Sequence, residues 1–161
     1  MTAQQQVETF LQEHKIAYKI KTHPAVFTCE EAEQHCKTVP GIAAKNLFLK
    51  DKTKNYFLYI LPAKKRADLK VFAAQIQTKK VTFASDSELK EKLGLEPGSV
   101  SIFGLLNDTK KEVALYLDQE IYDAATVNFH PNVNTASVIV EHKEFKKILD
   151  AFGYQVQLLK N

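Results

Sequence analysis

The side chains best placed to do chemistry stand at the start of an apolar strand. Residues 41–49 read Gly-Ile-Ala-Ala-Lys-Asn-Leu-Phe-Leu, which predicts a strand whose apolar core directly follows Lys45 and Asn46. An ammonium group loses its hydration on burial, so a lysine is costly there unless it has a partner. Lys45 therefore indicates an anionic ligand, a partner carboxylate or an exposed end of the strand.

Two further segments combine turn-forming and polar residues with short apolar runs, which is typical of ligand-binding loops. They are residues 96–108, with Gly98, Ser99, Phe103 and Gly104, and residues 129–136, with His130 and Asn134. Small residues in the first segment allow close approach of the backbone, and exposed amides there can stabilise a developing oxyanion. A plain turn is the alternative explanation of its Pro97-Gly98 pair.

His130 precedes Pro131, which holds the histidine in an extended conformation and fixes its direction. A neutral histidine can hydrogen-bond a ligand or polarise a water molecule. A single histidine is also common as an ordinary surface or core residue. The neighbouring Asn132, Asn134 and Thr135 favour a polar pocket wall, and we therefore predict that His130 belongs to a binding site.

Other catalytic chemistries find little support in the sequence. Ser99 and Ser101 have no G-x-S-x-G setting, and nothing places a base beside a cysteine. Paired C-x-x-C or H-E-x-x-H spacing is lacking among His23, Cys29, His35 and Cys36. In a helix the two cysteines would lie about 10 Å apart, too far for a disulfide. We predict no metal site and no cofactor.

Length and composition are those of one domain with a proper core, since 45% of the 161 residues are hydrophobic. No apolar run approaches the roughly 20 residues that span a bilayer, so we expect no membrane association. The N-terminus lacks both the basic start and the apolar stretch of a signal peptide. These features, with two reduced thiols, indicate a cytosolic protein.

The net charge of +3 is only mildly basic, but the basic residues are clustered. One cluster comprises Lys64, Lys65, Arg66 and Lys70, and lysines also surround the turn at residues 50–54. Such clusters can contact phosphates as point charges, although a solvated surface explains them equally well. Arg66 is the only arginine, so bidentate arginine forks cannot be the main contacts to phosphate.

Hydrophobic periodicity and capping residues predict interleaved helices and strands. Strands are expected near residues 18–20, 41–49, 56–61, 81–84, 112–117, 137–140 and 155–159. Helices are expected near residues 7–14, 28–39, 68–76, 85–94 and 143–152. Several strand pairs are joined as hairpins, so we predict an α/β (α+β) fold with a mixed sheet.

Together these segments resemble the YbaK/ProX family of aminoacyl-tRNA deacylases, also called the prolyl-tRNA synthetase-associated domain. The likeness runs almost end to end, from Thr22-His23-Pro24-Ala25 and Thr28 with Glu31, through Lys45-Asn46, to Asn134-Thr135-Ala136. It is strongest to the free-standing branch that hydrolyses alanine mischarged onto proline tRNA. The resemblance implies a single domain over residues 1–161, with a curved mixed β-sheet, surrounding helices and a pocket at one end.

The resemblance also implies roles for individual residues. Lys45 would be the catalytic residue, holding the 3′ end of the tRNA near the pocket without a side-chain nucleophile or a metal. Asn46 would point to the opposite face of a regular strand and reach the substrate through a bulge or a backbone contact. The other predicted substrate-binding residues are Thr28, Gly98, Ser99, Phe103, Gly104, His130 and Asn134. By their residue types, Phe27, Ile42 and Phe103 could shape a compact apolar pocket, although such residues are more often plain core.

The implied partner is the acceptor end of aminoacyl-tRNA(Pro), with prolyl-tRNA synthetase as a further one. Hydrolysis of a cysteinyl, seryl or threonyl ester by the same fold is one alternative, because the sequence does not report the pocket volume. A module that binds tRNA or the synthetase without turnover is another. A lysine-rich binder of small anions is a third.

Overall fold

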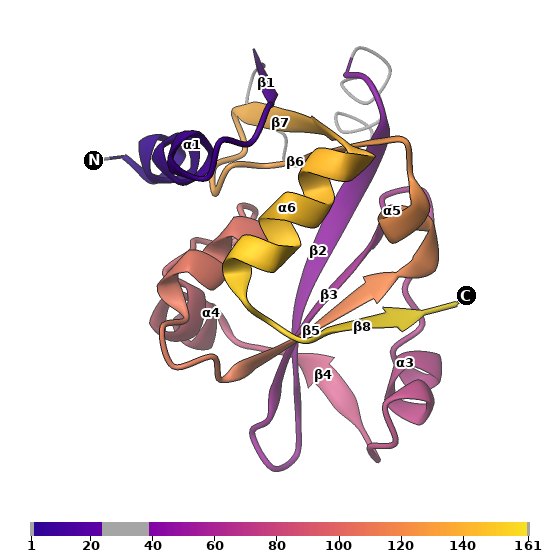
Figure 1. Ribbon diagram of the computed structural model, residues 1–161. Helices are drawn as coiled ribbons and strands as arrows, with labels where there is room; N and C mark the ends of the chain where they lie inside the picture. Colours follow the sequence, from indigo (N-terminus) through magenta and orange to yellow (C-terminus); the bar gives the residue numbers. More distant parts are fainter. Residues whose placement is uncertain (1, 24–38, 161) are drawn as a thin grey trace.

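The computed structural model describes residues 2–23 and 39–160 and confirms a mixed α/β fold (Figure 1). Within this part of the chain eight strands form one sheet in the order β1-β7-β6-β2-β3-β5-β8, and β4 pairs with β2. The strands are β1 (Lys19–Thr22), β2 (Ile42–Asp51), β3 (Tyr56–Pro62), β4 (Val81–Phe83), β5 (Val113–Asp118), β6 (Thr126–Phe129), β7 (Ala136–Glu141) and β8 (Val156–Leu159). The helices are α1 (Ala3–Glu13), α3 (Leu69–Gln75), α4 (Asp86–Leu93), α5 (Gln119–Asp123), α6 (His142–Phe152) and the 3-10 helix η1 (Ile102–Asn107).

The strands that form hairpins and the strands joined by crossovers give the sheet both kinds of pairing. β2 pairs antiparallel with β3 and β4, and β7 pairs antiparallel with β1 and β6. β2 with β6, β3 with β5, and β5 with β8 are parallel pairs. The predicted mixed sheet is therefore confirmed.

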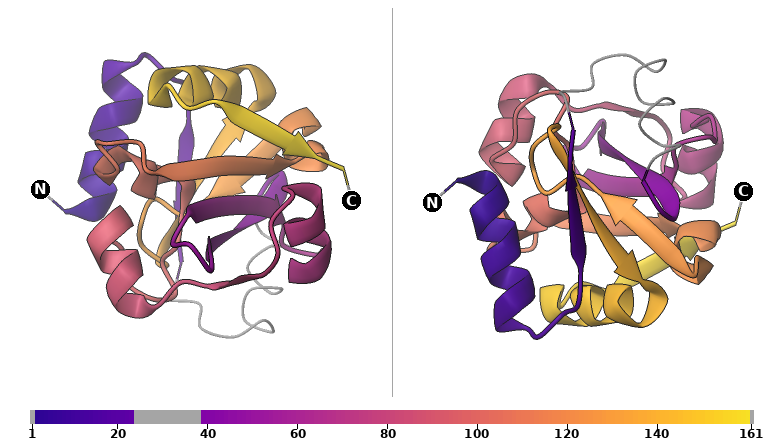
Figure 2. Two further views of the ribbon diagram at one scale, coloured as in Figure 1. Left: turned by 90° about the horizontal axis from the view of Figure 1, so that it is seen from below. Right: turned by 90° about the horizontal axis from the view of Figure 1, so that it is seen from above.

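Apolar side chains pack on both faces of the central strands β2 and β3. One face carries Phe48, Leu58 and Ile60 and is covered by α1, α4 and α6. The other face carries Leu49 and Leu61 and is covered by α3. Figure 2 shows α6 and α3 on opposite sides of the sheet. Successive residues of β2 alternate between these two environments, as the period of a strand requires.

The helix ends agree closely with the predicted capping signals. Asp68 accepts hydrogen bonds from the first backbone amides of α3. Ser85 and Glu88 form a reciprocal capping box at the start of α4, and Gly94 ends that helix in the left-handed region, with a φ of 66°. The predicted helix that begins at Thr28 lies outside the described residues.

Among the described elements, β6, α5 and η1 are absent from the sequence-based prediction. The predicted elements include none between residues 118 and 136, although Val127 and Phe129 alternate as in a strand. β6 has only four residues, and its neighbours β2 and β7 come from distant parts of the chain. Pairing with those strands, rather than local periodicity, defines it.

The carboxylate of Glu88 links α4 to the sheet, and its loss should destabilise the fold. It accepts a 2.7 Å bond from the Lys50 ammonium and a bond from the Tyr56 hydroxyl, and the Glu88 side chain is 16% exposed. These bonds, that from Lys50 foremost, hold the pKa of Glu88 well below its ordinary value of 4.5. The group therefore stabilises the fold above about pH 4.5, and this contribution is lost as the pH falls toward the folded-state pKa.

We expect Glu88→Gln to lower the free energy of unfolding by about 2 kcal/mol at neutral pH. The difference from wild type should shrink at pH 3, where the unfolded state is already protonated. Urea denaturation at both pH values measures it. The matched control is Glu96→Gln, because the exposed Lys90–Glu96 pair should contribute less than about 1 kcal/mol. Equal effects of the two variants would contradict this account of the network.

In the part of the chain described here, no helix is long and apolar enough to cross a membrane.

Candidate functional site

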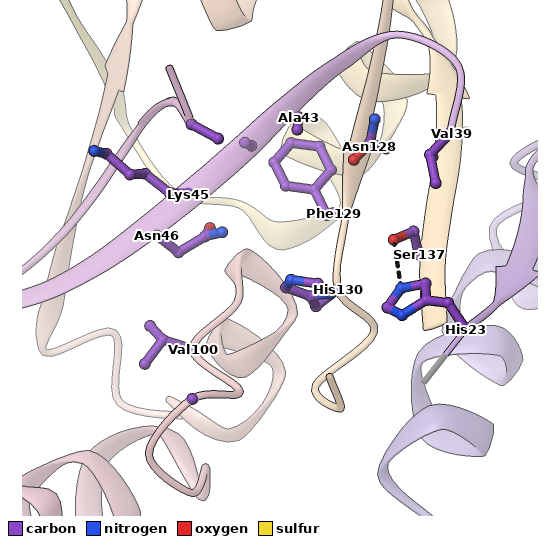
Figure 3. A pocket seen from close by; sticks show the side chains of 13 residues that line it. His23, Val39, Ala43, Lys45, Asn46, Val100, Asn128, Phe129, His130 and Ser137 are labelled. Atoms are coloured by element: carbon purple, nitrogen blue, oxygen red, sulfur yellow. Dashed lines mark hydrogen bonds between the residues drawn. The ribbon is translucent and has the colours of Figure 1, made fainter. Parts of the chain in front are cut away.

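A cavity of about 380 Å³ opens where β2 parts from β6 (Figure 3). The two strands pair only through Ile42 with Val127 and Ala43 with Asn128, after which β2 continues along β3. The apolar wall of the cavity consists of Val39, Ala43, Ala44, Ala63, Gly98, Val100 and Phe129. Its polar wall consists of His23, Lys45, Asn46, Asn128, His130 and Ser137.

Gly41 brings β2 close enough to β6 to form this junction. Its φ is +89°, and a Cβ atom there would lie 2.7 Å from the carbonyl oxygen of Thr126. No other residue fits such a position without displacing the backbone. Asn128 secures the same corner, because its side-chain amide donates a 3.0 Å bond to the carbonyl oxygen of Pro40.

Lys45 and Asn46 both line the cavity, but from opposite faces of β2. The ladder from Ala44 to Lys50 is unbroken, so the predicted alternation holds without a bulge. Figure 3 shows the Asn46 side chain directed toward His130 and the Lys45 side chain leaving the strand on the other side. No bulge is present, and the Asn46 side chain itself lines the cavity.

Asn46 is a buried amide without a hydrogen-bond partner. The residue is only 9% exposed, and among the described residues neither Nδ2 nor Oδ1 has a partner. A buried orphan amide costs about 1–3 kcal/mol, so native structures rarely keep one without a reason. Its donor and its acceptor both face a cavity, which indicates that a polar ligand pairs with them.

The Lys45 ammonium is half-buried, and we find no ion pair or hydrogen bond for it within residues 2–23 and 39–160. Of the alternatives raised by the sequence, a partner carboxylate is thus not observed in this part of the chain. The charge remains available at the mouth of the cavity for an anionic ligand.

His130 is held in one tautomer at the cavity. Its Nδ1 lies 3.1 Å from the carbonyl oxygen of Ala136, which can only accept, so Nδ1 donates and Nε2 of the neutral ring keeps a lone pair. Burial lowers the pKa of His130 below its ordinary value of 6.5, against the bond to Ala136, and nearby His23 lowers it further. The ring is therefore neutral at pH 7 and presents an acceptor.

Ser101 fixes the backbone of His130. The serine is fully buried, and its hydroxyl donates to the carbonyl oxygen of His130 while accepting from the amide of Phe103. It therefore joins the start of η1 to the loop after β6. The sequence favoured Ser99 in this segment, whereas the structure gives the positioning contact to Ser101.

A second histidine stands beside the first. The rings of His23 and His130 are 6.2 Å apart and meet edge to face. His23 Nε2 lies 3.1 Å from the Ser137 hydroxyl, and the amide of His23 donates to the carbonyl oxygen of Thr135. The ends of β1 and β7 are thereby joined at the cavity wall (Figure 3).

Phe103 and Gly104 do not line the cavity. Phe103 is fully buried in the core, where its ring packs edge to face on Phe129 and Phe152. A Cβ on Gly104 would lie 2.7 Å from Leu95 Cδ1, so this glycine serves the packing of η1. Because Phe103 and Gly104 are both buried in the packing of η1, the prediction that these two residues contact the substrate is corrected. Ile42 likewise packs against the core.

Ser99 and Asn134 are half-buried and stand outside the lining. The amides of Ser99 and Gly104 donate to the carbonyl oxygens of Glu96 and Ser101, so the loop does not offer them to an oxyanion. Gly98 does line the cavity. Thr28 and Phe27 lie outside the described residues.

Three polar lining residues escaped the sequence analysis as site residues, namely His23, Asn128 and Ser137. A signal was present, because Asn128 and Ser137 are polar positions in otherwise apolar strands, as Lys45 and Asn46 are. Their convergence depends on the pairing of β1 with β7 and of β2 with β6.

Among the described residues no group of three or more His, Cys, Asp or Glu could hold a metal ion. The cysteines Cys29 and Cys36 lie outside this part of the chain.

Three comparisons relate the chain to known proteins. The model of the aminoacyl-tRNA editing domain matches residues 23–148. The chain is 36% identical to the prolyl-tRNA editing protein ProX of Acetoanaerobium sticklandii, over 95% of this chain and 94% of the relative. It is 29% identical to the multifunctional Ser/Thr-tRNA deacylase ProXp-y of Escherichia coli K12, over 89% and 86%.

The fold is also found in a crystal structure described as a candidate trans-editing enzyme for prolyl-tRNA synthetase. The TM-score is 0.74 at 21% identity, with 100% of this chain and 98% of that chain covered. The two chains thus share one fold. The chain belongs to the aminoacyl-tRNA editing domain family, and the predicted resemblance is confirmed.

Proposed function

We propose that this aminoacyl-tRNA hydrolase removes alanine from mischarged tRNA(Pro). The observation that carries the proposal is the orphan amide of Asn46, which points toward a neutral His130 in a cavity with Lys45 at its mouth. An aminoacyl ester offers matching groups, namely an α-ammonium donor, a carbonyl acceptor, ribose hydroxyls and a phosphate.

The side chains divide the work as follows in this proposal. Lys45 holds the 3′-terminal phosphate or ribose at the mouth of the cavity. Asn46 donates from Nδ2 to the ester carbonyl oxygen, where negative charge develops, and accepts from the α-ammonium at Oδ1. His130 accepts at Nε2 from a ribose hydroxyl or from the attacking water.

Water then attacks the ester carbonyl, the bond to the ribose oxygen breaks, and the ribose hydroxyl is restored by proton transfer. The vicinal hydroxyl of the tRNA assists this step, and no side-chain nucleophile is required. The free amino acid and the uncharged tRNA leave.

The proposed preference for alanine rests on the resemblance to the branch of the family that removes alanine from proline tRNA, and the small wall residues Ala43, Ala44, Ala63 and Gly98 leave room for the aminoacyl group. A synthetase pocket built for proline excludes a smaller side chain by only about 1–3 kcal/mol per methylene. A second pocket that admits alanine and rejects the proline ring completes the selection. We place the protein in the cytoplasm, acting on tRNA(Pro) released by prolyl-tRNA synthetase.

The test is hydrolysis of a panel of esters of one tRNA(Pro), with alanyl, prolyl, cysteinyl, seryl and threonyl forms at equal concentration. We expect fast release of alanine with the prolyl ester spared. Faster release of serine or threonine would mean that the site acts on seryl or threonyl esters instead, which is the activity named for the Escherichia coli relative. Binding of tRNA without turnover of any ester would leave only a binding module.

The lowered pKa of His130 gives a pH dependence of known sign. Protonation removes the Nε2 acceptor, so the rate should fall at low pH, and the lowered pKa puts this fall below the ordinary histidine value of 6.5. The midpoint of the decline of kcat/KM on the acid side should therefore lie below pH 6.5. If the His130→Gln variant no longer shows this decline at acid pH, the role of His130 Nε2 as an acceptor is supported. An unchanged decline contradicts that role.

A further inference from the structure

A second cavity, of about 320 Å³, lies between β3 and α3 on the other face of the sheet. Leu61, Lys65, Arg66 and Val71 are among the residues that line it. Leu61 is the cross-strand partner of Lys45, and such partners project to the same face. The Lys45 side chain therefore leaves β2 toward this cavity, while Asn46 points into the first one.

The end of β3 connects the two cavities. Ala63 lines the first cavity, and its amide donates to the carbonyl oxygen of Ala43 across the strands. Leu61 and Lys65, two residues to either side, line the second. A chain that leaves the first cavity past Lys45 thus meets Lys64 and Arg66 next.

Two of the basic side chains along this path are without an acidic partner among the described residues. Lys64 and Arg66 are exposed, and the described residues provide no ion pair or hydrogen bond for either. Three carboxylates in this part of the chain lie nearby: Asp118 and Glu120 pair with Lys65 at 3.1 and 3.8 Å, and Asp68, which lines the second cavity, accepts from the first amides of α3.

An apolar side chain completes the path. Val71 lines the second cavity and is 45% exposed, although it stands in the first half of α3 beside charged residues. An exposed aliphatic side chain next to free cations suits a ligand that is both anionic and partly apolar. A nucleotide, with its phosphate and its base, is such a ligand.

We propose that the single-stranded 3′ end of the tRNA runs along this path. The terminal adenosine and its ester occupy the first cavity, and the nucleotides before it lie between β3 and α3. Their phosphates face Lys64 and Arg66, and a base contacts Val71. This inference rests on the proposed function, whose substrate is the same tRNA.

The test compares Lys64→Glu/Arg66→Glu with the control Lys52→Glu/Lys54→Glu, which makes the same change of charge in the exposed β2–β3 turn at the far end of the sheet (Figure 1). Two probes are used: alanyl-tRNA(Pro), and alanyl-adenosine, which lacks the preceding nucleotides. For the first variant we expect at least a roughly tenfold fall in kcat/KM on the tRNA ester, with kcat at saturation and the rate on alanyl-adenosine unchanged.

Binding of uncharged tRNA(Pro) gives an independent measurement. Each lost contact to a single-strand phosphate should reduce the slope of log Kd against log salt by about 0.7. Since Lys64 and Arg66 would each lose one contact, the slope for the variant should be lower by about 1.4. Equal behaviour of the variant and the control, or an equal loss on alanyl-adenosine, overturns the inference. Failure of the proposed function is a different result, because wild-type protein would then hydrolyse neither probe.

Discussion

Replacing Asn46 by leucine should make the protein more stable and nearly inactive. Leucine has a similar branched shape, and it removes a buried amide that has no partner among the described residues. The free energy of unfolding should rise by about 1 kcal/mol, because an unpaired buried donor and acceptor are lost. Hydrolysis of alanyl-tRNA(Pro) should fall about 100- to 1,000-fold in kcat/KM, as when one oxyanion donor is deleted.

Urea denaturation and single-turnover hydrolysis measure the two effects on the same preparation. The companion variant Asn46→Asp keeps the shape but buries a carboxylate, so it should lose both stability and activity. If Asn46→Leu were instead less stable than wild type, the amide would serve the fold, and our interpretation of Asn46 as a ligand-binding group would be wrong.

Lys45→Ala should lower kcat/KM for alanyl-tRNA(Pro) about 100-fold with little change in stability. The expected loss corresponds to about 2.7 kcal/mol, in the range of a charge-assisted contact at a reacting centre. Stability should change by less than about 0.5 kcal/mol, since the ammonium has no ion pair within the described part of the chain.

Rates at limiting and saturating tRNA separate positioning from binding. A loss at limiting substrate alone means that Lys45 contributes uniform binding, and a loss at both means that it acts in the transition state. The control is Lys52→Ala in the exposed β2–β3 turn, which should behave as wild type. Wild-type rates for Lys45→Ala under both conditions would remove Lys45 from the site.

Local signals carried most of the fold prediction. Asp68, the Ser85–Glu88 capping box and Gly94 mark helix ends that the structure reproduces. These signals depend on neighbouring residues alone, which is why they can be read from sequence. β6 and α5 are too short to show a period, and tertiary pairing defines β6.

A polar residue that interrupts an apolar strand is a local signal for a cavity-lining position, but the direction of a side chain and the pairing of distant strands cannot be read from the sequence. Lys45 and Asn46 were found by that interruption, and both line the cavity. Phe103 lies on the side of the 3-10 helix η1 that faces the core, and the spacing of residues in the sequence does not show which side of so short a helix is buried. His23 and Ser137 meet only through the β1–β7 pairing.

An alanine-specific editing pocket is tested most directly by one measurement. Wild-type protein in excess is mixed with alanyl-tRNA(Pro) or prolyl-tRNA(Pro), and release of the labelled amino acid is followed against a blank without protein. We predict rapid release of alanine and a prolyl ester as stable as in the blank. Equal release of both amino acids, or release of neither, would contradict this assignment.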